Sequence, residues 1–157
     1  MLSGSLAVNV YSVPRMSLDI DIVIELKETY LDSFFEIFSE GYYININTVK
    51  QEILRYGMFK VINLRTGFKV DFILKKETEY RNNEFSRRRR ESIADFDVWI
   101  VSPEDLVISK IAWIQQLKSD KQINDIENLI AIPGLDISYI IYWCNKLNLN
   151  SYGLIYS

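Results

Sequence analysis

Three aspartates stand where a β-strand would normally carry apolar side chains. Asp19 and Asp21 open the run DIDIVIEL at residues 19–26, and Asp71 interrupts the apolar run KVDFIL at residues 69–74. Aspartate is disfavoured in strands. Side chains two positions apart on a strand point to the same face, so Asp19 and Asp21 project together. The rest of 19–26 is apolar and predicts a strand buried on both faces, whose first end borders a site.

Carboxylates that gather on one face repel each other unless a cation compensates their charge. If the strand with Asp71 lies beside the strand with Asp19 and Asp21, the three side chains converge and Mg²⁺ could relieve the repulsion. Proteins bind this hard cation through one or two carboxylates together with substrate phosphates. A second interpretation needs no metal: Asp19 caps the strand, Asp21 faces solvent and Asp71 pairs with a lysine. Asp-x-Asp is common by chance, so spacing alone leaves both open.

The composition removes many kinds of active site. The chain has no histidine, which excludes Ser-His-Asp triads, Cys-His pairs and His-ligated zinc. Its single cysteine, Cys144, excludes a Cys₄ zinc site and an internal disulfide. Chemistry must therefore come from carboxylates, lysine, arginine, hydroxyls and backbone amides. The net charge of −3 does not predict general nucleic-acid affinity, although Arg87 to Arg90 form a local basic cluster.

The same sequence predicts a cytoplasmic protein with no membrane partner. With 157 residues, 48% of them apolar, the chain can form one domain with a packed core. No apolar run approaches the length of a membrane span. The first residues, MLSGSLAVNV, lack the basic region and cleavage site of a signal peptide.

Apolar periodicity predicts an α/β core over 1–101 and a helical part over 102–157 that packs on the same unit. Arg65-Thr66-Gly67 has the composition of a short hairpin turn. Ser102, Pro103 and the acids that follow are typical of a helix start. The predicted strands are 19–26, 42–46, 58–64, 68–74 and 97–101. The predicted helices are 4–13, 29–40, 48–56, 77–90, 103–118, 121–132 and 136–147.

The order of the motifs resembles the signature of the nucleotidyltransferase superfamily. Gly4-Ser5-Leu6-Ala7 opens a predicted helix, Pro14-Arg15-Met16-Ser17 follows, and Asp19-Ile20-Asp21-Ile22 begins the strand. In that superfamily a Gly-Ser pair likewise opens a helix that precedes a strand with Asp-x-Asp. The match resembles the branch that contains the nucleotidyltransferase-type toxins of abortive-infection toxin–antitoxin systems and related uncharacterised bacterial proteins.

Later segments extend the resemblance to about residue 147. Val70-Asp71-Phe72 resembles the third carboxylate of the superfamily. The segment from Ser102 to Lys110 and the triplet Asn124-Asp125-Ile126 resemble its helical lysine and aspartate motifs. One departure is that relatives usually carry an element upstream of the glycine, whereas three residues precede Gly4. We therefore expect the first motif to lie close to a frayed terminus.

The resemblance implies a nucleotidyltransferase-like mixed sheet flanked by helices and followed by a helical C-terminal part. It also implies Mg²⁺-dependent transfer of a nucleoside monophosphate from an NTP to an acceptor, which in a toxin could be tRNA or protein, with a cognate antitoxin as a further partner. The implied catalytic and metal-binding residues are Asp19, Asp21 and Asp71. The implied nucleotide-binding residues are Gly4, Ser5, Arg15, Lys110 and Asp125.

Several of these roles have simpler alternatives. A glycine-led helix N-terminus is a natural phosphate cradle, but Gly4-Ser5 could also be an ordinary helix start. Lys110 lies within the apolar sector of its helix, so its head must reach water or an anion. Arg15 could bind phosphate or be solvated, and Asp125 could orient Lys110 or only pack. Arg87 to Arg90 span a predicted helical turn, so they cannot all contact one ligand, and most would be solvated.

Two other functions compete with transfer. The first is a catalytically inert fold of the same kind that binds nucleotide or a protein partner. The second is a metal-dependent nuclease, because Glu25-Leu26-Lys27 is similar to part of the nuclease Asp…Glu-x-Lys pattern. A nuclease needs its acid and its Glu-x-Lys motif on adjacent strands, whereas here both belong to one predicted strand.

Overall fold

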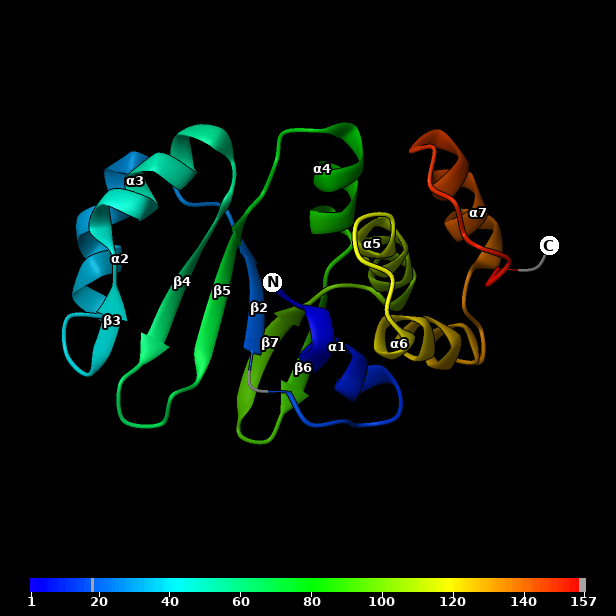
Figure 1. Ribbon diagram of the computed structural model, residues 1–157, viewed down its shortest axis with the longest axis horizontal. Coiled ribbons are helices and arrows are strands. Elements are labelled where there is room, and N and C mark those ends of the chain that lie inside the picture. The colour runs from blue at the N-terminus through cyan, green and yellow to red at the C-terminus, as the bar shows by residue number, and fades with distance from the viewer. Residues whose placement is uncertain (18, 156–157) are drawn as a thin grey trace.

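A computed structural model describes residues 1–17 and 19–155, and one mixed seven-stranded sheet runs through this part of the chain (Figure 1). The strand order is β3-β4-β5-β2-β1-β7-β6. The mixed α/β class predicted from the sequence is confirmed. The strands are β1 (Leu2–Ser3), β2 (Asp19–Ile24), β3 (Tyr42–Ile44), β4 (Met58–Asn63), β5 (Lys69–Leu74), β6 (Arg89–Ile93) and β7 (Phe96–Ile100).

Seven α-helices and one 3₁₀ turn accompany the sheet in the described residues. None of these helices combines the length and the apolar character that crossing a bilayer requires. The helices are α1 (Gly4–Tyr11), α2 (Leu31–Ile37), α3 (Ile46–Arg55), α4 (Glu79–Ser86), α5 (Pro103–Ile114), α6 (Asp120–Ile130) and α7 (Ile137–Lys146), and the 3₁₀ turn η1 covers Glu28–Tyr30.

Two hydrophobic cores hold the helices on the sheet. At one end α2 and α3 pack on β4 and β5, and at the other α1, α5, α6 and α7 form the larger core (Figure 1). In the first core Phe59 stacks on Phe72 with ring centroids 5.4 Å apart. Because side chains alternate along a strand, the neighbours Lys60 and Asp71 point to the opposite face, away from α2 and α3. That face carries the polar groups of the site.

The central strands pair as the hydrophobic pattern requires. β4 and β5 form the predicted antiparallel hairpin, in which Lys60 lies opposite Asp71. β2 lies on the other side of β5 and runs parallel to it, with Asp21 opposite Asp71. The expectation that β2 is buried on both faces is wrong, since Val23 is its one buried residue and Asp19 is exposed. Asp19, Asp21 and Val23 share one face of the strand, which is therefore polar at its first end and buried further along.

The expectation of a frayed N-terminus is also wrong. Leu2 pairs with Ile22 of β2 on one side and with Ile100 of β7 on the other. The ammonium group of Met1 donates a hydrogen bond of 2.8 Å to the carbonyl of Val23. The short strand β1 thus ties the segment before Gly4 into the middle of the sheet. Two residues are too few for a periodic pattern, so the sequence analysis missed this strand.

The predicted helix 77–90 is wrong in its second half, because α4 ends at Ser86 and the arginine run enters β6. β6 pairs antiparallel with β7, with Arg90 opposite Trp99. Arg87 and Arg88 are partly buried and held by neighbouring groups, whereas Arg89 and Arg90 are exposed on β6. Arg87 binds Asp105 and Glu104, Arg88 lies over the rings of Phe85 and Trp99, Arg89 lies 3.6 Å from Glu104, and Arg90 binds Asp97. The helix predicted over 103–118 ends earlier, at Ile114.

A buried carboxylate joins three helices at the end of the larger core. Asp105 is fully buried and accepts hydrogen bonds from Ser102 Oγ at 2.6 Å, Arg87 Nε at 3.0 Å and Tyr139 Oη at 2.7 Å. Tyr139 Oη in turn accepts a hydrogen bond of 2.6 Å from Asn83. Because these donors come from α4, α7 and the start of α5, this network fixes how the three helices meet.

Replacing Tyr139 with Phe should lower the free energy of unfolding by about 2 kcal/mol, because Asp105 loses a donor in a buried place. Urea unfolding followed by circular dichroism measures this change. Tyr142→Phe is the matched control on the same helix, since its hydroxyl is exposed and should matter little. Equal stability of the two variants would show that the network does not hold α7.

Candidate functional site

The three aspartates project from one face of the sheet. Asp21 and Asp71 are direct partners in the parallel pair β2–β5, and Asp19 lies two residues before Asp21 on the same strand. This is the face that α2 and α3 leave uncovered. Asp19 is exposed, Asp21 is half-buried and Asp71 is buried. The arrangement brings two carboxylates side by side, with a third at the end of the strand.

Lys60 occupies both carboxylate oxygens of Asp71. Its Nζ donates to Oδ1 at 2.6 Å and to Oδ2 at 2.7 Å. Among the described residues, no three acidic, histidine or cysteine side chains are grouped closely enough to hold a metal ion as they stand. For Asp71, the pairing with a lysine that the sequence left open as the metal-free interpretation is what the structure shows.

The N-terminus of α1 touches the second aspartate. Gly4 has a φ of +59°, and a Cβ added to it would lie 1.7 Å from Asp21 Oδ2. The first turn of α1 also acts on the pKa of Asp21, because the backbone N–H of Ser5 lowers it. Only glycine permits this close approach, because any side chain would overlap the carboxylate. The helix tip and the aspartate strand therefore form one unit.

The surroundings of Asp21 disfavour its charged form. Burial raises the pKa of Asp21, and the neighbouring charges of Asp71 and Asp19 raise it further. The ammonium of Lys110 and the N–H of Ser5 oppose this shift without cancelling it. A carboxylate in this state gains from any added positive charge within reach. Positive charge placed close to Asp21 would therefore favour its charged form.

Behind the helix tip, two cations share one buried carboxylate. Arg15 binds Asp125 through Nε at 2.7 Å and Nη2 at 2.8 Å, and Nη2 also donates to Ser5 Oγ at 2.6 Å. Lys110 donates to Asp125 Oδ2 at 2.8 Å and to Gln122 Oε1 at 2.9 Å. Four of the five residues predicted to bind nucleotide, Ser5, Arg15, Lys110 and Asp125, thus form one cluster, and Gly4 precedes Ser5.

The contacts and burial of this cluster bear on the alternatives for its members. The side chain of Lys110 is 7% exposed and that of Asp125 is 3% exposed, so Lys110 does not extend to solvent. Arg15 is 21% exposed and is not a solvated surface residue. Asp125 orients both cations. One nitrogen of the guanidinium, Arg15 Nη1, is buried without a hydrogen-bond partner among the described residues.

The protonation behaviour of the cluster follows from burial and pairing. Burial lowers the pKa of Lys110, although its hydrogen bond to Asp125 acts in the opposite direction. Burial acts to raise the pKa of Asp125, but the hydrogen bonds from Arg15 and Lys110 outweigh it and leave that pKa lowered. Asp125 is therefore an anion at neutral pH and carries the charge that keeps both cations in place.

Sequence reasoning missed three residues that complete the site. Asn9 accepts from the backbone N–H of Arg15 at 2.9 Å and donates to its carbonyl at 2.7 Å, which fixes the loop after α1. Gln122 is a second partner of Lys110. Lys60 binds Asp71 from the next strand. A pattern of adjacent residues does not reveal such partners, because they lie far apart in the chain or act through the backbone.

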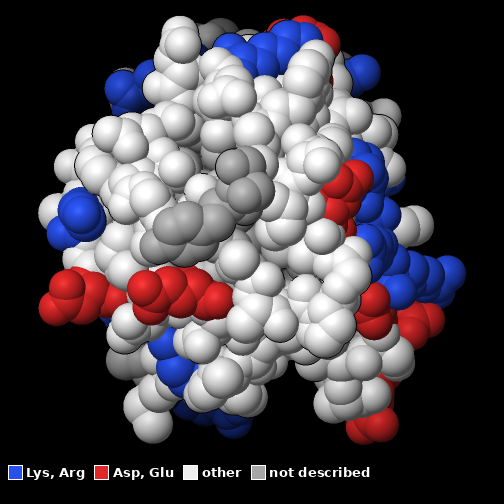
Figure 2. Space-filling model, turned by 90° about the vertical axis from the view of Figure 1, so that its right-hand side faces the viewer, with Lys and Arg blue, Asp and Glu red and all other residues white. Residues whose placement is uncertain are grey.

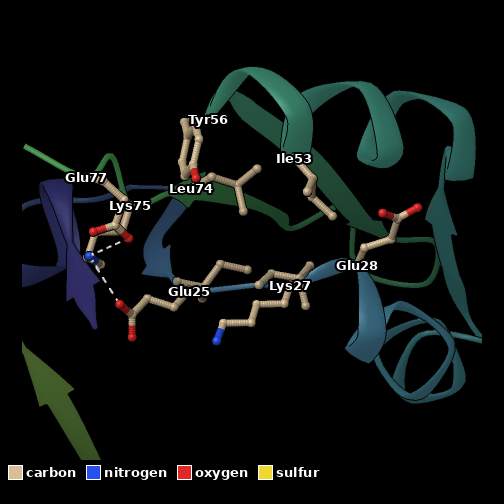
Figure 3. Close-up of a pocket in the computed structure, with 10 residues that line it drawn as sticks. Glu25, Lys27, Glu28, Ile53, Tyr56, Leu74, Lys75 and Glu77 are labelled. Carbon is tan, nitrogen blue, oxygen red and sulfur yellow. Dashed lines mark hydrogen bonds and ion pairs between the residues drawn. The ribbon is translucent and has the colours of Figure 1, made fainter.

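A separate pocket of about 380 Å³ lies past the ends of β2 and β5, on the side of α3 (Figure 3). Leu74, Ile53 and Tyr56 supply apolar lining, and Glu25 and Glu77 each lie 3.1 Å from the buried ammonium of Lys75. None of the residues predicted for catalysis or nucleotide binding lines it. The Glu25-Leu26-Lys27 triplet belongs to this pocket, at the far end of β2 from Asp19, which gives the nuclease hypothesis no support.

The donor set on the aspartate face fits a hard divalent cation. Asp21 and Asp71 are adjacent carboxylates whose charges disfavour each other, and such oxygens are the ligands that Mg²⁺ prefers. Mg²⁺ usually takes its remaining ligands from water and substrate phosphates, so two protein carboxylates suffice. Asp71 can join such a site once its oxygens leave Lys60.

Comparison with known proteins bears on the fold. No family model matches the sequence, and no curated protein matches it. Among solved structures, the chain is similar to the antibiotic-resistance factor ANT(2'')-Ia, an aminoglycoside nucleotidyltransferase, with a TM-score of 0.66 and 15% sequence identity. The match covers 94% of this chain and 80% of that one. The chain therefore has a nucleotidyltransferase fold, and the resemblance to the toxin branch stays a prediction.

Replacing Asp125 with Asn should lower the free energy of unfolding at neutral pH by about 3 kcal/mol, because two buried cations lose their counter-charge. The folded-state pKa of Asp125 is lowered, so its contribution is present above the ordinary aspartate pKa and is lost as pH falls through the lowered value. Urea titrations at pH 7 and pH 3 should therefore show a smaller difference between variant and parent at pH 3. A pH-independent difference would contradict the assignment.

Replacing Gly4 with Ala should destabilise the protein more than the same change at Gly67. Both glycines have a positive φ, so both variants carry the backbone cost of about 1 kcal/mol. Only at Gly4 does the new Cβ overlap Asp21, whereas nothing lies within 4 Å of a Cβ at Gly67. Thermal unfolding of both variants measures the difference. Equal losses would show that the helix tip does not press on Asp21.

Proposed function

We propose that this protein is a nucleotidyltransferase that transfers a nucleoside monophosphate from an NTP to an acceptor, with Mg²⁺ held by Asp21 and Asp71 and with Asp19 beside them. The observation that carries the proposal is the contact of the Gly4–Ser5 helix tip with Asp21, whose strand partner is Asp71. A phosphate-binding helix end and paired carboxylates are the two parts that this chemistry needs. The nucleotidyltransferase fold supports the proposal.

The charged cluster behind the start of α1 would favour the binding of a triphosphate. Arg15 and Lys110 bring two positive charges against the single negative charge of Asp125, so the cluster keeps a net positive charge. Arg15 also holds the hydroxyl of Ser5, which orients it next to the first turn of α1. Helix N-termini favour anions through their free N–H groups and dipole. We assign this corner to the phosphates of the NTP.

On the aspartate face, Mg²⁺ bound by Asp21 and Asp71 would supply charge neutralisation for the triphosphate and the leaving pyrophosphate. Asp71 would also accept the proton of the attacking acceptor hydroxyl, as a positioned carboxylate can. Asp19, which is exposed at the start of β2, would add negative charge that strengthens metal binding. These roles need the two strands in their observed register.

Three classes of acceptor are compatible with the proposed transfer. The resemblance to abortive-infection toxins favours tRNA or a protein, and a toxin role would bring a cognate antitoxin as partner. ANT(2'')-Ia is described as an aminoglycoside nucleotidyltransferase, so a small aminated sugar is a third class of acceptor to test. All three classes offer a hydroxyl group for attack on the α-phosphate.

Changing Asp19 and Asp21 to Asn together should abolish transfer of label from α-³²P-NTP, by at least about a hundredfold, because metal binding and charge stabilisation are lost. Folding should survive, since the change relieves the repulsion between Asp21 and Asp71. The assay offers tRNA, protein and aminoglycoside in separate reactions. Circular dichroism checks the fold.

The matched control changes Asp32 and Asp95 to Asn, two exposed aspartates elsewhere that give the same change in net charge. This control should transfer label as the parent does. If the parent is active and the Asp19/Asp21 variant keeps that activity, the site assignment is wrong. If the parent binds a partner or nucleotide but transfers nothing, and the variant binds equally well, the inert alternative holds instead.

A further inference from the structure

Lys60 is placed by the sheet to meet Asp71. The antiparallel register of β4 and β5 puts the two residues directly opposite each other, on the face that carries Asp21. The lysine side chain is 49% exposed, whereas that of Asp71 is 11% exposed. A half-exposed lysine side chain therefore covers a nearly buried carboxylate.

The contact uses the atoms that a metal ion would need. Lys60 Nζ lies 2.6 Å from one oxygen of Asp71 and 2.7 Å from the other. Coordination by a divalent cation would use the same oxygens, and two cations cannot share so small a space without strong repulsion. Asp71 can thus bind either the ammonium or the metal.

The other carboxylate of the pair is not covered in this way. Asp21 lies against Gly4 at the tip of α1. The charge of Lys60 is therefore directed at one of the two carboxylates. Lys69 lies two residues before Asp71 on β5 and on the same face. It is opposite Asp19 in the register and is exposed.

We propose that Lys60 competes with the divalent cation for Asp71, so that the free protein binds the metal weakly and Asp71 becomes a ligand only when the ammonium leaves. The side chain of Lys60 is long and half-exposed, so it can swing away without disturbing β4. The competition rests on the proposed metal site. Its consequence for the proposed function is that the metal enters with the NTP, whose phosphates add ligands.

The test is a titration of the full chain with Mn²⁺ alone, followed by isothermal calorimetry or by the electron paramagnetic resonance of free Mn²⁺. Lys60→Met should bind Mn²⁺ about three- to fivefold more tightly than the parent, as expected from losing a partly exposed ion pair. Lys69→Met makes the same change in net charge on the same face but leaves Asp71 paired. It should change the affinity less than about twofold.

A second pair of variants assigns the effect to Asp71. In an Asp71→Asn background the Lys60→Met change should no longer tighten Mn²⁺ binding, because the contested oxygens have lost their charge. Lys60→Gln, which keeps a polar side chain, repeats the experiment if the Met variant unfolds. With Asp71 in place, unchanged or weaker Mn²⁺ binding by Lys60→Met or Lys60→Gln would overturn the proposal. An equal gain in Mn²⁺ affinity in Lys69→Met would overturn it too.

Label transfer measured in parallel separates this proposal from the proposed function. A gain in Mn²⁺ affinity without label transfer by any variant would support the role of Lys60 and contradict the transferase. Label transfer by the parent, with no gain in Mn²⁺ affinity in the Lys60 variants, would support the transferase and contradict the role of Lys60. Absence of Mn²⁺ binding in every variant would overturn the role of Lys60, and label transfer alone would then decide on the transferase.

Discussion

The parallel pairing of β2 with β5 is the constraint on which the rest of the site depends. Its register puts Asp21 directly beside Asp71, on the face that the first hydrophobic core leaves free. Two adjacent carboxylates are costly unless positive charge or donors surround them. Lys60 supplies charge to Asp71, and the N–H of Ser5 and the more distant ammonium of Lys110 act on Asp21. These nearby polar groups offset the repulsion between Asp21 and Asp71.

The glycine at the helix tip and the buried cations connect the aspartate strands to the helices. Without a side chain at position 4, the first turn of α1 can reach Asp21. Arg15 then connects the hydroxyl of Ser5 to Asp125 on α6, and Asp125 connects to Lys110 on α5. The cluster thus joins the helical half of the molecule to the aspartate strands. Figure 2 shows the end of the molecule formed by this helical half, where charged side chains lie mainly toward the rim.

Much of this arrangement could be predicted from local patterns. The hairpin from Met58 to Leu74 follows from two apolar runs around a glycine-containing turn, and the aspartates stood out because they break such runs. The helix start at Ser102 follows from its cap. The nucleotidyltransferase resemblance gave the fold that the comparison with solved structures supports.

What could not be predicted depends on pairing between distant segments. β1 has two residues and exists because β2 and β7 flank it. The second half of the arginine run belongs to β6 because β7 pairs with it, although the composition of the run suits a polar helix. Carboxylates on α5 bind Arg87 and Arg89. The ion pair between Lys60 and Asp71 follows from the strand register, which no spacing within either strand reveals. The partners of Arg15 and Lys110 likewise come from other elements.

A crystal structure with Mn²⁺ and a non-hydrolysable NTP would test the central claim most directly. Anomalous scattering locates Mn²⁺ without reference to the protein coordinates. The account predicts a peak between the carboxylates of Asp21 and Asp71, with the triphosphate against the Gly4–Ser5 helix tip and Lys60 displaced from Asp71. A peak in the pocket beside Glu25 and Glu77, or a triphosphate bound away from the helix tip while Lys60 stays on Asp71, would contradict it.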